Sequence, residues 1–213
     1  MADNYLPKQA FDSPLVVFLI TAVQFVFWLP VRLIVVVMRR GLNRQLTTSS
    51  IIPTQHYTIV ANHQSMLDPF MICGSLSLPV YLKLMPYRFF VHNGFIDNPW
   101  LRPFLILLGG FPAREHERYW HGIAAAERYL AGGQTSVIFP EGKRTPARIP
   151  AKPGAGVLAQ IPSNYLIPAH IHWHKGRYPW QLKFRLAIGD PINASDLSSD
   201  EIMDKIYSLE LKK

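Results

Sequence analysis

The residues of this chain best suited to chemistry are His63 and Asp68, in the stretch Asn62-His63-Gln64-Ser65-Met66-Leu67-Asp68. This stretch directly follows Tyr57–Ala61, an apolar run that predicts a buried strand, and functional loops of α/β proteins follow strand ends. Within one continuous helix, the two side chains would project about 140° apart. They can meet only if His63 lies in a loop and Asp68 lies in the first turn of the next helix.

Two neighbouring residues support that break between loop and helix. Ser65 opens a Ser-x-x-Asp capping pattern, and Pro69 is tolerated only in a first turn. Asp68 would then orient the imidazole of His63 and raise its basicity, which is the base-and-orienter pair of hydrolases and acyltransferases. Ser65 is a nucleophile in principle, although capping alone explains it. The alternative is an ordinary strand–turn–helix in which Asp68 is a cap and His63 lies on the surface.

A second polar stretch, Phe139-Pro140-Glu141-Gly142-Lys143-Arg144-Thr145, follows another predicted strand. A Pro-Glu-Gly turn with two adjacent cations suits a phosphate or a polar headgroup, although an ordinary basic turn has the same composition. The stretch Gly109–Arg114 reads as a short strand that ends in a cation. Arg114 could bind phosphate through both guanidinium nitrogens, or it could be a surface arginine.

A later predicted strand contains Ile167-Pro168 and three alternating histidines. The proline indicates a sheet edge or a bend near the site. His170, His172 and His174 would project from one strand face, and three side chains in line converge poorly on one tetrahedral ion. We therefore expect no metal there and interpret the row as solvated or interfacial histidines.

Taken in order, these motifs resemble the glycerolipid acyltransferase family of the PlsC type. The family patterns Asn-His-x4-Asp, Gly-x-Phe-x-x-Arg and Phe-Pro-Glu-Gly-x-Arg, followed by an apolar-Pro motif, match Asn62–Asp68, Gly109–Arg114, Phe139–Arg144 and Ile167–Pro168. The resemblance covers about Tyr57 to Ile192. Lys143 departs from the Thr or Ser common in the family, Ala113 departs from Asp, and the histidine row replaces an apolar stretch.

The resemblance implies an enzyme of phospholipid biosynthesis that moves a fatty acyl group from acyl-CoA or acyl carrier protein to a lysophospholipid hydroxyl. The expected acceptor is lysophosphatidate, with another lysolipid or glycerol 3-phosphate as alternatives. His63, oriented by Asp68, would act as general base, without an acyl-enzyme, metal or cofactor. The implied substrate-binding residues, with Asn62 or a backbone N–H as oxyanion donor, are Asn62, Ser65, Lys83, Gly110, Phe111, Arg114, Glu141, Gly142, Lys143 and Arg144. A hydrolase and a non-enzymatic lipid-binding protein are the competing interpretations.

The element in front of these motifs is the apolar segment Leu15–Met38, which is long enough to span a bilayer because roughly 20 residues suffice. Arg32 beside Pro30 opposes a simple span. The alternatives are a bent helix or hairpin in one leaflet and, less favoured, a buried core helix. In the leaflet arrangement, arginines at 32, 39, 40 and 44 would lie at the cytoplasmic headgroups, and we expect the bacterial inner membrane.

Composition agrees with membrane attachment, since hydrophobic residues make up 49% of the chain and charged residues 17%. The formal net charge of +8 favours anionic partners. The chain has no long Lys or Arg run and no recognition motif, so we expect no nucleic-acid partner. A single cysteine, Cys73, excludes an internal disulfide and reads as a buried structural thiol.

The rest of the sequence predicts an α/β fold, a mixed, largely parallel sheet flanked by helices, with an anchoring segment at 1–48 and a catalytic domain at 49–213. Predicted strands are Tyr57–Ala61, Ser136–Phe139, Tyr165–Ile171 and Leu182–Ile188. Predicted helices are Pro69–Leu76, Trp100–Leu108, Glu115–Ala131, Gly154–Gln160 and Ser199–Leu209, the last capped by Ser198 or Ser199.

Overall fold

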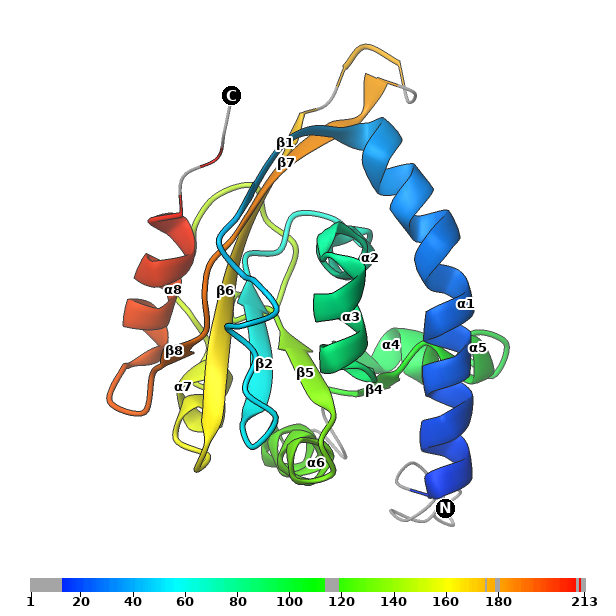
Figure 1. Cartoon of the computed structure of the whole chain (residues 1–213), viewed down its shortest axis with the longest axis vertical. Helices are drawn as coiled ribbons and strands as arrows, with labels where there is room; N and C mark the ends of the chain where they lie inside the picture. Colours follow the sequence, from blue (N-terminus) through cyan, green and yellow to red (C-terminus); the bar gives the residue numbers. More distant parts are fainter. Residues whose placement is uncertain (1–12, 114–118, 175, 179–180, 210, 212–213) are drawn as a thin grey trace.

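Strands drawn from the whole length of the chain form one mixed sheet in the computed structural model (Figure 1). The structure describes residues 13–113, 119–174, 176–178, 181–209 and 211, without the side chains of 119–121. The strand order is β1-β7-β6-β2-β5-β3-β4, and β8 pairs with β6. The bounds are β1 Arg39–Arg44, β2 His56–Ala61, β3 Tyr87–Val91, β4 Gly110–Pro112, β5 Thr135–Ile138, β6 Asn164–His174, β7 Lys183–Ile188 and β8 Ile192–Asn193.

Parallel pairing dominates the sheet. Strands β6, β2, β5, β3 and β4 run parallel to one another, whereas β7 and β8 are antiparallel to β6 and β1 is parallel to β7. The predicted mixed, largely parallel sheet is therefore confirmed. Because β2 and β5 are parallel neighbours, the loops that follow them emerge side by side at the same edge.

Helices cover both faces of the sheet (Figure 1). The helices α1 (Pro14–Met38), α2 (Asp68–Ser75) and α3 (Leu78–Leu84) lie on one face, and α6 (Tyr119–Ala131), α7 (Gly154–Ala159) and α8 (Ser199–Tyr207) lie on the other. Two short helices, α4 (Asn93–Ile96) and α5 (Arg102–Leu107), lie near the middle of α1. A hydrophobic core lies between the sheet and the helices on each face. Successive strand residues pack into opposite cores, as Ile59 and Val60 of β2 do.

The apolar N-terminal segment is one helix, α1, which continues through Pro30 and leads directly into β1. A hairpin is therefore excluded. Among the described residues, α1 is the one helix long and apolar enough to cross a membrane. Its most apolar stretch of 18 residues has a mean hydropathy of 2.2, and only 11% of this stretch is buried. This low burial argues against a buried core helix.

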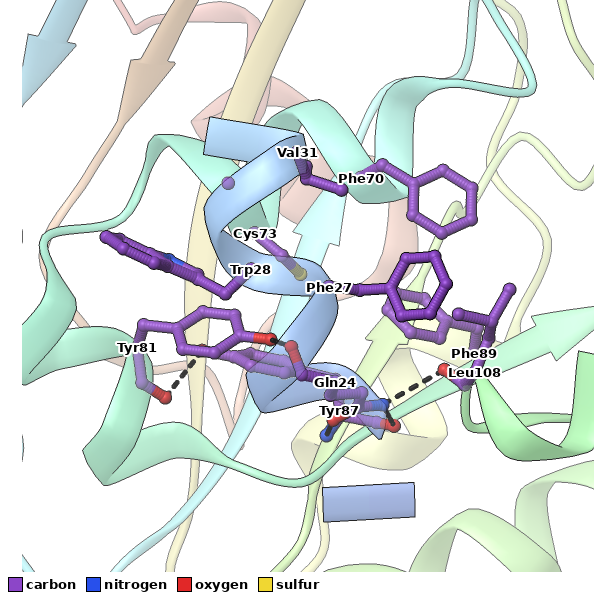
Figure 2. A pocket seen from close by; sticks show the side chains of 11 residues that line it. Gln24, Phe27, Trp28, Val31, Phe70, Cys73, Tyr81, Tyr87, Phe89 and Leu108 are labelled. Carbon is purple, nitrogen blue, oxygen red and sulfur yellow. Dashed lines mark hydrogen bonds between the residues drawn. The ribbon is translucent and has the colours of Figure 1, made fainter. Parts of the chain in front are cut away.

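The side chain of Gln24, in the middle of α1, is hydrogen-bonded to the sheet. The Gln24 amide donates to the backbone oxygens of Tyr87 at 2.8 Å and Leu108 at 3.0 Å, and its oxygen accepts the Tyr87 N–H at 2.9 Å. Figure 2 shows Gln24 among the side chains that line an apolar cavity, Trp28 and Phe70 included. The volume of this cavity is about 40 Å³. Cys73 lines the same cavity, and burial raises the pKa of its thiol, in agreement with the predicted structural role.

Two sequence expectations about the sheet need correction. Strand β6 is interior, so Pro168 does not mark a sheet edge. It lies instead where the partner of β6 changes from β8, at Tyr165 and Leu166, to β7, which begins at Ala169. The missing N–H of the proline falls at this gap in pairing, which is why the strand tolerates it. Strand β1, within the segment predicted as an anchor, is part of the sheet.

Candidate active site

The structure brings His63 and Asp68 together at the end of β2. The strand ends at Ala61, His63 lies in the following loop, and Asp68 occupies the first turn of α2. The His63 Nδ1 atom lies 2.9 Å from Asp68 Oδ2. The predicted break between loop and helix is therefore confirmed, and it places the two side chains in contact.

The Asp68 carboxylate is fully buried and receives hydrogen bonds on both oxygens. Its Oδ2 accepts the backbone N–H groups of Gln64 at 2.7 Å and Ser65 at 2.8 Å, and its Oδ1 accepts the indole N–H of Trp173 at 2.6 Å. These donors and the N-terminus of α2 stabilise the negative charge. Nδ1 of His63 then carries the proton shared with Asp68, and Nε2 keeps a free lone pair.

The loop after β5 closes over His63 from the neighbouring strand. The Phe139 ring stacks on the imidazole with a centroid distance of 4.2 Å. Glu141 Oε2 accepts the His63 N–H at 2.6 Å, and Thr145 N–H donates to the His63 carbonyl at 2.7 Å. These bonds hold the histidine backbone on both sides, so the two motifs form one unit.

Glu141 is itself buried, with an exposed fraction of 1%. Its Oε1 accepts a hydrogen bond from the Tyr207 hydroxyl at 2.8 Å. Burial raises the pKa of its carboxyl against the opposing effects of the bonds from His63 and Tyr207. The structure therefore uses Glu141 to connect the loop, His63 and α8 rather than to face solvent.

The cations of this loop lie outside that buried connection. Lys143 and Arg144 are exposed on the turn that follows Gly142, whose φ of +63° is a conformation that glycine adopts readily. Both cations are therefore in contact with solvent, on the loop that holds the His63 backbone. Arg114 lies outside the described residues.

Several residues predicted to bind substrate instead support the fold, away from His63. Lys83 donates to the backbone oxygens of Thr48 and Ile51, near the start of β2 and β3, at the sheet end opposite His63. The structure therefore does not bring Lys83 to the site. Phe111 is 1% exposed and packs against Phe90 and Tyr129 in the core.

Gly110 and Ser65, also predicted to bind substrate, have local structural roles. A Cβ on Gly110 would lie 2.8 Å from the Leu105 carbonyl oxygen, so a close backbone approach explains this glycine. The Ser65 hydroxyl accepts the Leu67 N–H at 3.2 Å and acts as a local turn acceptor.

Asn62 also departs from its predicted role. It is fully buried, its amide donates to the Ile171 carbonyl at 2.9 Å, and its oxygen accepts the Ile171 N–H at 2.8 Å. The side chain thus replaces the next rung of the ladder between β2 and β6. This fixes the start of the loop but leaves Asn62 without a surface from which to stabilise an oxyanion.

Two residues of the site had no signal in the sequence motifs. Trp173, near the end of β6, bonds to Asp68, and Tyr207, in the last turn of α8, bonds to Glu141. Trp173 lies between His172 and His174 in the sequence, so its side chain projects from the opposite strand face, toward α2. This alternation was the one feature of the sequence that could have indicated its position.

The histidine row lies on one face of β6. His170 packs on Tyr207 at a centroid distance of 4.9 Å, and the rings of His172 and His174 lie 4.7 Å apart. Within the part of the chain that the structure describes, no group of three or more His, Cys, Asp or Glu side chains is placed to hold a metal ion.

The fold and the His63–Asp68 pair define an α/β protein with a carboxylate-oriented histidine at the carboxyl ends of parallel strands and a long apolar helix on one face of the sheet. Comparison with known families specifies this class. The family model described as Acyltransferase matches residues 43–172, more than half of the chain. The chain therefore belongs to the Acyltransferase family.

Similar proteins agree with this assignment. The chain is 28% identical over 119 residues to the 1-acyl-sn-glycerol-3-phosphate acyltransferase of Bacillus subtilis (strain 168), an alignment that covers 54% of this chain and 60% of the relative. It shares the fold of the 1-acyl-sn-glycerophosphate (LPA) acyltransferase PlsC from Thermotoga maritima, with a TM-score of 0.55 and 22% identity over 78% of this chain and 66% of that chain. The chain thus spans less than two thirds of either protein.

Proposed function

We propose that this protein transfers a fatty acyl group from a thioester, acyl-CoA or acyl carrier protein, to the free hydroxyl of a lysophospholipid, with lysophosphatidate as the first candidate. The observation that carries the proposal is the His63–Asp68 pair, in which a buried carboxylate orients the imidazole and leaves Nε2 free. The family and the names of the relatives support the reaction class.

In this mechanism, His63 Nε2 removes the proton of the acceptor hydroxyl as its oxygen attacks the thioester carbonyl carbon. The tetrahedral intermediate then collapses, the carbon–sulfur bond breaks, and the thiolate leaves with the proton from the imidazolium. Asp68 stabilises the imidazolium between the two steps. Such base assistance contributes about 10²–10⁴-fold to the rate. No acyl-enzyme, metal or cofactor takes part in this proposal.

The acceptor phosphate is the proposed ligand of Lys143 and Arg144, together with Arg114. The exposed position of Lys143 and Arg144 beside the His63 loop supports this role. The lipid substrates would reach the site from a membrane, to which α1 is proposed to attach the protein at the cytoplasmic face of a bacterial inner membrane. The exposed apolar face of α1 supports membrane attachment.

The test is a thiol-release assay on the detergent-purified full chain with long-chain acyl-CoA, with and without lysophosphatidate. We expect thiol release that depends on the acceptor, with phosphatidate as product. We expect His63→Ala to lose at least about 10²-fold in kcat while it keeps the wild-type circular dichroism spectrum. His56→Ala, which removes a histidine at the start of β2, is the matched control and should keep its turnover.

Other outcomes would point elsewhere. Thiol release without acceptor indicates a hydrolase, and full turnover by His63→Ala rejects His63 as the base. Silence with both acyl-CoA and acyl carrier protein across several lysolipids favours a non-enzymatic lipid-binding protein.

A further inference from the structure

A group of basic side chains gathers where β1, β7 and the end of β6 lie side by side. His172 of β6 lies directly across from Arg185 of β7, and the ring of His174 contacts that of His172 at 4.7 Å. Arg40 of β1 joins them where the pairing of β1 with β7 is irregular, between Arg39 and Gly41. We call Arg40, His172, His174 and Arg185 the basic cluster.

The basic cluster is separate from the proposed catalytic site. Because side chains alternate along a strand, His172 and His174 project from the face of β6 opposite to Ile171 and Trp173. Ile171 lies in the core on the α2 side of the sheet, and Trp173 bonds to Asp68 there. The cluster therefore belongs to the other face, beyond the end of α8.

Two nitrogen atoms of the cluster are buried without a hydrogen-bond partner among the described residues. They are Nε of Arg185 and Nε2 of His174. Buried polar atoms in proteins are nearly always satisfied, so each such atom requires an explanation. The two residues lie on the same face of neighbouring strands, one facing pair apart, so both nitrogens lack a partner in the same part of the sheet.

The described groups that act electrostatically on the cluster's His174 belong to the cluster itself. Burial lowers the pKa of the His174 ring, and the positive charges of His172, Arg185 and Arg40 lower it further. Every charged neighbour that acts on His174 among the described residues is thus cationic. Lys183, directly across from His174, adds a further positive charge, although its Nζ donates to the Val37 carbonyl at 2.7 Å.

We propose that Arg40, His172, His174 and Arg185 form a binding site for a phosphate group. Guanidinium and imidazole N–H donors on one face match the oxygens of a phosphate, which would satisfy the two orphan nitrogens and neutralise the charge. The phosphate belongs either to an anionic phospholipid headgroup or to a soluble phosphate. The headgroup is favoured, because α1 ends at Met38 and Arg40 follows two residues later, where an apolar helix would leave a bilayer.

This site is independent of the proposed acyl transfer, so its test uses binding and not turnover. In the detergent-solubilised full chain, the Cε1–Hε1 NMR signals of His172 and His174 are followed, with assignments from His→Asn variants. Sodium phosphate is titrated against sodium chloride of equal ionic strength. In a second arm, the micelles are doped with phosphatidylglycerol or, for comparison, with phosphatidylcholine.

We expect both histidine signals to shift with phosphate or with phosphatidylglycerol, toward the protonated form, because a bound anion opposes the cationic neighbours. Arg40→Gln, which removes an exposed side chain, and Arg185→Gln should each weaken the response about tenfold or more. Arg128→Gln, which removes an exposed cation from α6, is the matched control and should respond as wild type does.

A response to phosphatidylglycerol alone identifies a lipid headgroup, and a response to phosphate alone identifies a soluble ligand. If chloride and phosphatidylcholine move the signals as strongly, or if nothing moves them, the site does not exist. Loss of acyl transfer in the His63 assay would leave this result unchanged, so the two proposals fail separately.

Discussion

The acidic partner of His63 is the most heavily constrained side chain of the site. Asp68 holds the imidazole while it accepts three other N–H groups, two from the backbone of its own loop and one from Trp173. A carboxylate bonded in this way has little freedom to rotate, which fixes the direction of His63 Nε2. Orientation of the imidazole therefore depends on a residue far away in the sequence.

Replacement of that distant residue gives the first residue-scale prediction. Trp173→Phe keeps an aromatic ring but removes the N–H that bonds Asp68 Oδ1 at 2.6 Å. We expect kcat to fall about tenfold or more with little change in KM, since a hydrogen bond to a charged group contributes about 1.5–3 kcal/mol. Trp28→Phe is the control, because its indole nitrogen has no hydrogen-bond partner among the described residues. Equal kinetics for both variants would contradict a positioning role.

Glu141 gives a prediction about stability and pH. Burial raises its pKa above the ordinary value of 4.5, so the folded state holds this proton more tightly than the unfolded state does. The stability from the protonated form is present in full below pH 4.5 and is lost as the pH rises through the raised pKa. Glu141→Gln should lack this loss, since its amide oxygen can still accept the His63 N–H while its NH2 group donates to the Tyr207 hydroxyl. Thermal midpoints against pH for both proteins test it, and parallel curves would refute the assignment.

The sequence revealed those contacts of the site whose residues are close together along the chain, and missed those between distant residues. His63 and Asp68 were predictable because the loop and the first helical turn that join them are one continuous stretch. Glu141 was recognisable only as part of a motif after a neighbouring strand, without its bond to His63. Trp173 and Tyr207 were not found, since their roles exist only once β6 and α8 pack beside the loops.

At the scale of elements, the Gln24 side chain ties the middle of α1 to β3 and to the residue before Gly109 with three hydrogen bonds. Gln24→Leu would leave the Tyr87 N–H and the carbonyls of Tyr87 and Leu108 without this partner. We expect a loss of about 1–3 kcal/mol in the free energy of unfolding, because unsatisfied buried polar groups are costly. Thermal unfolding in detergent measures it. Thr21→Val is the control, because the Thr21 hydroxyl donates to the Val17 carbonyl of its own helix. An equal loss in both variants would argue against the anchor.

Strong local patterns predicted most elements close to their observed bounds. The strand predicted at Tyr57–Ala61 spans His56–Ala61, and the last helix begins at the predicted Ser199 with Ser198 as its cap. Strand β1 was missed because Arg39–Arg44 has little β-branched or aromatic character and becomes a strand only by pairing with β7. The apolar residues of β3 were not assigned, since their strand depends on pairing with β5.

At the scale of the whole molecule, apolar side chains are exposed over α1 and extend to the segment around α5, which packs against α1. On α1, Phe18, Phe25 and Val37 are among the exposed residues, and before α5 the Trp100 side chain is 83% exposed. Monomeric soluble proteins rarely leave so much apolar surface in water. This surface is therefore the proposed contact with lipid.

Trp100 gives the whole-molecule prediction. If this surface enters the interface of a bilayer, an exposed tryptophan is placed at headgroup level, as aromatic residues of membrane proteins are. We expect brominated phospholipids in vesicles to quench tryptophan fluorescence of the full chain, and Trp100→Phe to lose a large share of that quenching. The Trp173→Phe variant, which removes a partly buried indole, should keep it. Unchanged quenching in Trp100→Phe would place this surface away from lipid.

The direct passage from α1 into β1 has a mechanical consequence. No linker separates the apolar helix at Met38 from a strand that is hydrogen-bonded into the sheet at Arg39. If α1 lies in a bilayer, the sheet cannot move independently of it, because any tilt of the helix turns the sheet as well. The height and the angle of His63 relative to the lipid surface are then fixed by the direct connection of α1 to β1. The proposed acyl transfer would reach only acceptor hydroxyls that lie at that height.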